Sequence, residues 1–241
     1  GLLWLFAKKK LDAQKTGIAI GLLIAIDLMS IGMRYLNSDN YVPSDEFEAQ
    51  FNPRPVDQQI KQDPDPYYRV FDLTADPYND AMGAYHHKLV GGYHPAKMEI
   101  YQDLITHQLS GGKMNAEVLN MLNTKYLIYS AGQNQPAIQP NPNACGNAWF
   151  VPAVKLVRNA DEAMLSLNAG NFGDTAQVAN PFRAKDVAVV LQPHWKQKTT
   201  TFQQDSSASI RLTKYGLNAL SFESTNSFEG FAVFADIYYP L

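Results

Sequence analysis

The pattern of apolar and polar residues changes several times along the chain, beginning with a long apolar stretch. Gly17–Met33 is almost continuously apolar and carries one charge, Asp27. A helix of this length reaches roughly 25 Å, and flanking residues such as Arg34 and Tyr35 extend it to the thickness of a bilayer. The pattern predicts a transmembrane helix over residues 16–35, in which Asp27 faces other helices or a polar cavity.

Two other interpretations of this stretch stay open. A secretory signal peptide also has a basic start and an apolar middle, and a buried helix of a soluble protein is apolar as well. However, Ser30–Met33 is a poor cleavage site, and Gly1–Ala7 is a second apolar piece that looks like the end of an earlier membrane helix. We therefore favour a membrane span within a longer protein.

After the apolar stretch the chain becomes polar and then regains periodicity. Residues 36–65 are rich in proline, Asn, Asp, Gln and Ser, which predicts an extended tether. A mixed α/β region is expected over residues 66–179. Its predicted elements are strands at Tyr68–Leu73 and Lys125–Tyr129, a turn at Asp76–Asn79, and helices running from Asn79 toward Leu89, over Ala96–Leu109, after Asn115 and after Asn159.

The last third of the chain is typical of a β module. A proline-rich excursion at residues 131–147 suggests a long-looped hairpin between Lys125–Tyr129 and Ala148–Val157. Short strands follow, separated by turn residues: Asp186–Leu191, Ala208–Thr213, Asn218–Glu223 and Phe231–Ile237. We predict an α+β fold: a membrane-type helix, a mixed region, and a truncated antiparallel β-sandwich-like module over residues 180–241.

Composition and charge narrow the class of protein. Apolar residues make up 46% and charged residues 18% of the 241, so a substantial core is expected. The net charge of −3 argues against nucleic acid as a partner, and a single cysteine excludes an internal disulfide and a cysteine zinc cage. Residues 1–15 carry a net charge of +3, which leaves a net charge of −6 for the remaining residues. The basic segment is therefore expected in the cytoplasm and the main domain outside.

Histidine, tyrosine and glycine gather in one short segment, Tyr85–Lys97. Adjacent histidines on a helix diverge by about 100°, and no metal-binding spacing occurs, so a shared metal is disfavoured. We predict a polar binding surface here, with ordinary turn packing as the alternative. Its candidate residues are Tyr85, His86, His87, Gly91, Gly92, Tyr93, His94 and Lys97.

Other motifs give little evidence of chemistry. The sequence has no phosphate-binding glycine loop and no GxSxG nucleophile motif, and Cys145 has no neighbouring histidine. The tyrosine pairs Tyr67–Tyr68 and Tyr238–Tyr239 could stack on sugar rings or pack in a core. We therefore assign no catalytic residue, no metal and no cofactor.

An ordered series of motifs resembles the YfhO-like family of bacterial membrane proteins. The series runs from about Asp27 to the C-terminus, and its order is more specific than any one motif. Its members are Tyr68–Leu73, Asp76–Asp80, Gly91–Lys97, Tyr101–Ile105, Leu119–Tyr126, Gly146–Val151, Asn159–Glu162 and Ala232–Pro240.

The resemblance implies a polytopic protein of the bacterial cytoplasmic membrane, similar to GT-C glycosyltransferases that use a lipid-linked sugar. The catalytic acidic loop of such enzymes would lie before this chain, so we expect no catalysis by the chain alone. The implied partners are the lipid bilayer and a lipid-linked sugar or envelope glycan.

Three functions follow in order of preference. The first is assistance in recognising the glycan acceptor or lipid-linked donor, and the second is a non-enzymatic binding or structural module of the cell envelope. The third, suggested only by the histidines, is a metal-dependent hydrolase.

Overall fold

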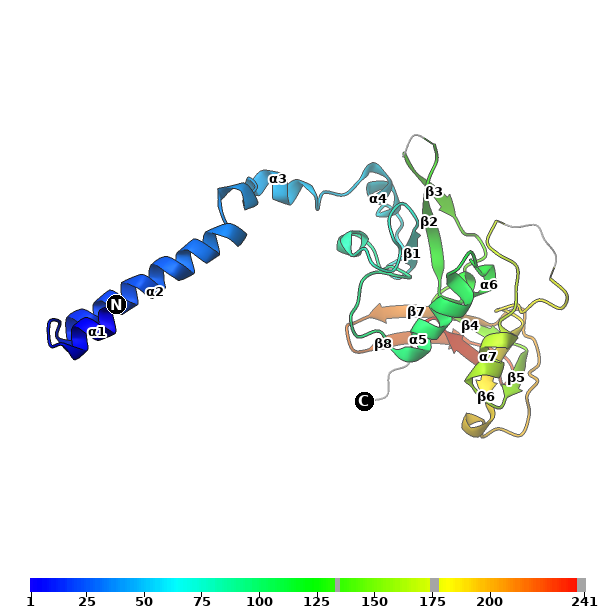
Figure 1. Ribbon diagram of the computed structural model, residues 1–241. Helices are drawn as coiled ribbons and strands as arrows, with labels where there is room; N and C mark the ends of the chain where they lie inside the picture. Colours follow the sequence, from blue (N-terminus) through cyan, green and yellow to red (C-terminus); the bar gives the residue numbers. More distant parts are fainter. Residues whose placement is uncertain (133–134, 174–177, 238–241) are drawn as a thin grey trace. The chain divides into compact units, whose positions relative to one another are not determined.

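The computed structural model describes residues 1–132, 135–173 and 178–237, and the chain divides into two compact units. The first unit is Gly1–Asn52 and the second is Pro53–Leu241 (Figure 1). The fold is α+β, as predicted: a long apolar helix is followed by mixed helices and strands and by antiparallel strand pairs near the C-terminus.

The first unit is helical and is dominated by α2 (Ala13–Tyr35). The Asp12 carboxylate begins this helix by accepting a hydrogen bond from the Lys15 backbone N–H at 2.7 Å. Three shorter helices complete the unit: α1 (Leu2–Ala7), the 3₁₀ helix η1 (Ser38–Asn40) and α3 (Ser44–Ala49).

Helix α2 is long and apolar enough to cross a membrane, with a mean hydropathy of 2.0 over its best window. Among the described residues it is the single helix of this kind. A helix in the core of a soluble protein is mostly buried, whereas Thr16 is the one buried residue of α2. The exposed apolar side chains therefore favour the membrane interpretation over a soluble core helix.

The interval 36–65 differs from the extended tether that its composition predicts. Besides η1 and α3 it contains α4 (Pro55–Ile60), which begins with proline at its first position. Val56 and Ile60 of α4 are buried against Val70 and Ile128. The tether prediction is thus wrong for α4, because two apolar side chains one helical turn apart pack this helix against the sheet of the second unit.

A three-stranded sheet opens the second unit. β1 (Arg69–Asp72) pairs in parallel with β2 (Thr124–Ser130), and β2 pairs antiparallel with β3 (Pro136–Pro140). The connection from β1 to β2 contains the 3₁₀ helix η2 (Met82–Tyr85), α5 (Glu99–Leu104), a π-helical turn η3 (Ile105–Leu109) and α6 (Ala116–Met121).

Two of the helix predictions in this connection need correction. The helix expected from Asn79 to Leu89 is reduced to η2, because Asp76 and Asp80 accept backbone hydrogen bonds that favour turns. The helix expected over Ala96–Leu109 starts at Glu99. The Asn115 cap is confirmed, since its side chain accepts from the N–H groups of two residues in α6.

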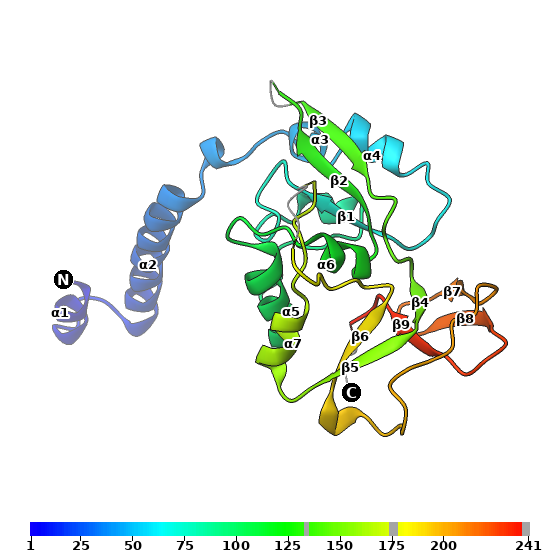
Figure 2. The same cartoon turned by 90° about the vertical axis from the view of Figure 1, so that its right-hand side faces the viewer.

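The remaining strands of the described residues form three two-stranded sheets. β4 (Ala148–Val151) pairs antiparallel with β9 (Phe231–Phe234), and β5 (Ala153–Val157) pairs in parallel with β6 (Val187–Leu191) across α7 (Ala160–Ser166). β7 (Ser209–Tyr215) and β8 (Leu220–Thr225) form an antiparallel hairpin, after the 3₁₀ helix η4 (Gln192–His194). In Figure 2, β1–β3 lie at one end of this unit and β4–β9 at the other.

The strand pairing corrects two expectations. The hairpin between Lys125–Tyr129 and Ala148–Val157 is wrong: β2 pairs with β3, and Pro152 separates β4 from β5. The strands expected at 186–191 and 231–237 exist, but each pairs with a strand that precedes residue 180. Two strands of the predicted β-sandwich-like module at 180–241, β9 and β6, therefore share their sheets with β4 and β5, whereas β7 and β8 pair with each other.

One main hydrophobic core joins both ends of the second unit. It includes Phe71, Val90, Leu119, Leu127, Trp149 and Phe182. The Trp149 indole N–H donates to the Ala184 carbonyl at 2.8 Å, so its one polar atom is satisfied within this core. The core fixes the segment after β1, which carries the predicted site residues.

Candidate functional site

The structure divides the predicted binding residues between two places in the second unit. His86 and His87 lie next to α4, in a network of polar contacts. Tyr93, His94 and Lys97 line an open groove beside α5. Tyr85 is exposed and lines neither this groove nor the second groove described below.

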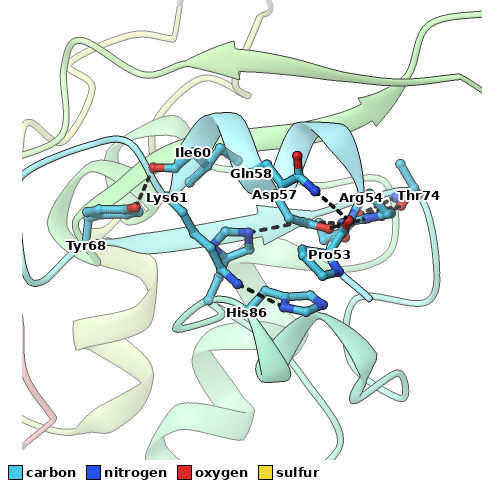
Figure 3. A network of polar contacts seen from close by, with 11 residues as sticks. Pro53, Arg54, Asp57, Gln58, Ile60, Lys61, Tyr68, Thr74 and His86 are labelled. Atoms are coloured by element: carbon cyan, nitrogen blue, oxygen red, sulfur yellow. Dashed lines mark hydrogen bonds and ion pairs between the residues drawn. The ribbon is translucent and has the colours of Figure 1, made fainter. Parts of the chain in front are cut away.

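Two adjacent histidines have different environments. The His87 side chain is only 2% exposed, and its Nε2 lies 3.0 Å from Oδ1 of Asp57, which is fully buried. His86 Nδ1 lies 3.2 Å from Lys61 Nζ, as Figure 3 shows. An aspartate–histidine pair can act in catalysis, but this pair is closed to a substrate and instead connects α4 to the segment after η2.

Arg54 completes the network around Asp57 (Figure 3). Its Nε and Nη2 donate to the two carboxylate oxygens of Asp57 at 2.8 and 3.0 Å. Nη2 also donates to Asp72 at 2.7 Å, and Nη1 donates to Thr74 at 2.9 Å. Because Asp72 belongs to β1, Arg54 fastens the start of α4 to the sheet.

Arg54 holds Asp57 ionised, and burial keeps His87 neutral. Burial by itself raises the pKa of Asp57, but the hydrogen bonds and charge of Arg54 outweigh it and lower that pKa to about 2. Burial also lowers the pKa of His87, against the opposing effect of Asp57. The neutral imidazole therefore donates its Nε2–H to the Asp57 carboxylate.

We expect stability to fall as the pH decreases below about 6.5, the pKa of an unfolded histidine. The unfolded chain then takes up a proton that the folded His87, with its lowered pKa, does not bind, and this favours unfolding. A second loss should follow between about pH 4 and pH 2, where Asp57 titrates. Urea unfolding from pH 5 to 8 measures the first effect.

The control for this pH dependence is His87→Gln, which keeps a donor for Asp57 but has no titratable group. Its stability should vary less than that of the wild type between pH 5 and 7. An equal slope in both proteins would show that other histidines cause the pH dependence.

The groove beside α5 is the more promising binding surface. Its volume is about 450 Å³, and its lining combines aromatic, amide and charged side chains. The lining residues are Tyr78, Asn79, Tyr93, His94, Pro95, Lys97, Glu99, Gln102 and Asp103. The Tyr93 side chain is 61% exposed, so its ring is available to a ligand.

Backbone contacts fix the edge of this groove. The Gly92 N–H donates to the Pro77 carbonyl at 2.7 Å, and the Tyr93 N–H donates to the Asp80 carbonyl at 3.2 Å. A Cβ on Gly91 would lie 1.8 Å from the Pro77 oxygen, so only glycine fits there. The two glycines thus position Tyr93 and contribute no side chain of their own.

Polar contacts also orient the other predicted residues. Lys97 Nζ donates to the Tyr78 carbonyl at 3.2 Å and lies 5.7 Å from the centre of the Tyr78 ring. His94 Nδ1 accepts from the Ala96 N–H at 3.2 Å, which leaves Nε2 as the donor of a neutral ring. The groove therefore offers donors and acceptors side by side.

Sequence reasoning missed the residues that α5 contributes to the groove. Glu99, Gln102 and Asp103 line it, and their i, i+3 and i, i+4 spacing places them on one face of α5. That spacing was visible in the sequence as a polar face opposite the apolar one. For Tyr78 and Asn79 the sequence predicts only a turn and a helix cap.

The predicted tyrosine pairs do not form stacking platforms in the described part of the chain. Tyr67 is buried, and its ring lies 4.7 Å from that of Tyr215. The Tyr68 hydroxyl donates to the Ile60 carbonyl at 2.9 Å, which fastens the end of α4 (Figure 3). Tyr238 and Tyr239 lie outside the described residues.

The structure adds no sign of metal or thiol chemistry. Over residues 1–132, 135–173 and 178–237, no three His, Cys, Asp or Glu side chains are grouped to hold a metal ion. Burial raises the pKa of the Cys145 thiol to about 12, so it is not a nucleophile at neutral pH. In comparisons with known proteins, no family model, no curated protein and no solved structure matches this chain.

Proposed function

We propose that the chain is a membrane-anchored domain that binds an envelope glycan, as part of a protein resembling GT-C glycosyltransferases of the YfhO-like family. One observation carries this proposal: the groove of Tyr93, His94 and Lys97 combines an exposed aromatic ring with fixed hydrogen-bonding groups. Ring faces stack on the C–H faces of sugars, and polar side chains bind their hydroxyl groups.

The charges of the groove favour the acceptor over the donor. Lys97 is its cation, and Glu99 and Asp103 are its carboxylates. Carboxylates accept hydrogen bonds from sugar hydroxyls but repel the phosphates of a lipid-linked donor. The acceptor glycan is therefore the proposed ligand.

The anchor in this proposal is α2. Its basic N-terminal flank would lie in the cytoplasm of a bacterium and the second unit outside, by the positive-inside rule. The proposed role is recognition without catalysis, since no catalytic residue is assigned to this chain.

Tyr93→Ala should weaken glycan binding about tenfold, because it removes the exposed ring of the groove. The measurement is calorimetric titration of the full chain in lipid nanodiscs with chitohexaose, cellohexaose and mannohexaose. Tyr85→Ala is the matched control, since Tyr85 is similarly exposed at 64% but lies outside the groove. Equal losses in both variants would contradict the assignment. A wild type that binds none of these sugars would favour a structural module of the cell envelope.

A further inference from the structure

A second groove lies at the other end of the second unit, away from α4 and α5. Its volume is about 770 Å³. It is formed by β4, by the segment 202–210 that leads into β7, and by the turn 226–230 between β8 and β9. None of its residues belongs to the site described above.

Three phenylalanine rings line this groove. Phe228 is 45% exposed, and Phe202 stacks on Phe231 with 5.9 Å between ring centres. A Cβ on Gly230 would lie 3.0 Å from the Phe150 ring, so the chain packs tightly against this third ring. The rings of Phe150 and Phe202 are thereby held in place, and the ring of Phe228 is open to a ligand.

The walls of the groove are tied together by Asp205. Its Oδ1 accepts from the N–H and hydroxyl of Ser207, and its Oδ2 accepts from the Ser227 N–H at 2.6 Å. These hydrogen bonds lower the pKa of Asp205 to about 2, and the bond from the Ser207 hydroxyl has the largest effect. The groove is thus preformed by a carboxylate whose two oxygens are already engaged.

The polar groups left for a ligand are mainly neutral amides. Gln203 and Gln204 are exposed, and their side chains form no hydrogen bond to any other described residue. Each amide offers two donors and an acceptor, which suits the hydroxyl groups of a sugar. Lys185 adds one cation to the lining.

From this lining we infer that the groove binds a neutral oligosaccharide. Phe228 stacks on a sugar ring, while the amides of Gln203 and Gln204 bind its hydroxyl groups. The choice of a glycan rests on the proposed function, but the residues are independent of the first groove. Two such grooves in one unit would let the domain contact a polymer at two points, which increases the effective affinity.

The test is ligand-observed NMR titration of the full chain in nanodiscs with chitohexaose, cellohexaose and mannohexaose. Phe228→Ala should weaken binding in this groove about tenfold, and Gln204→Ala should weaken it several-fold. Leu217→Ala is the matched control, because Leu217 is an exposed apolar residue of the β7–β8 turn outside the groove.

The outcomes separate this inference from the proposed function. If the two single variants Phe228→Ala and Tyr93→Ala both bind the sugars more weakly than the wild type, a second glycan groove is supported. Loss in Tyr93→Ala alone, with Phe228→Ala equal to the control, leaves the proposed function standing and overturns this inference. The reverse pattern supports this groove and overturns the first. A wild type with no saturable binding of any of the three sugars overturns both.

Discussion

Asp57→Ala should lower the free energy of unfolding by about 3 kcal/mol, since breaking a buried ion pair leaves its partners uncompensated. Asp57 is fully buried and accepts from both Arg54 and His87. We place the loss at the lower end of the range for such pairs because the Arg54 side chain is one-third exposed and retains Asp72. The expected decrease in melting temperature is roughly 6–12 °C, measured by circular dichroism.

Asp45→Ala provides the comparison for this variant. Asp45 is an exposed residue of α3 and forms no ion pair with another described residue. Its loss should change the unfolding free energy by less than about 0.5 kcal/mol. If the two variants melted at the same temperature, the network around Asp57 would make no contribution to the stability of the fold.

Gly91→Ala should destabilise the protein by about 3 kcal/mol or more, through a steric clash with the backbone. The added methyl group would lie 1.8 Å from the Pro77 oxygen and 3.1 Å from the Tyr78 ring. A backbone carbonyl cannot rotate away as a side chain does, so the turn must open and the Gly92 hydrogen bond to Pro77 is lost. Chemical unfolding in urea measures the change.

Gly111→Ala distinguishes this clash from the general cost of replacing a glycine. Gly111 has φ +62° and open space around it, so alanine there costs only about 1 kcal/mol of backbone strain. A similar cost at both positions would mean that the Gly91–Pro77 contact relaxes easily. Tyr93 would then not depend on Gly91 for its position.

The sequence predicts correctly those helices and strands that are determined by residues within or next to them. The continuous apolar run gave α2, and the side chains of Asn115 and Asn159 cap α6 and α7 as their spacing indicates. The buried strand at Lys125–Tyr129 lies within β2. Each of these elements is determined by neighbouring residues, so no knowledge of distant contacts was needed.

The elements that were mispredicted depend on distant partners. Pro152 separates β4 from β5, and each strand pairs with a segment more than 30 residues away, Phe231–Phe234 or Val187–Leu191. In α4, the proline at Pro55 looked like tether composition, although proline is also common at the first position of a helix. Its docking depends on Ile128, which no local pattern reveals.

The candidate site could be predicted only in part, because some of its contacts join residues that are far apart in the sequence. Tyr93, His94 and Lys97 lie together because they are close in sequence, and the structure adds Glu99 and Asp103 from α5. His87 and its neighbour were expected on one surface, but the partner of His87 is Asp57, thirty residues earlier. A histidine alone gives no sign of whether it is buried against a carboxylate.

The docking of α4 sets how far the second unit can travel from its anchor. An extended chain over residues 36–65 would allow about 100 Å, whereas residues 36–52 allow about 60 Å, and less where η1 and α3 are helical. With α2 in a bilayer, the second unit could therefore reach no further than about 60 Å from the membrane surface. In the proposed function, a glycan would therefore be bound within that distance of the membrane.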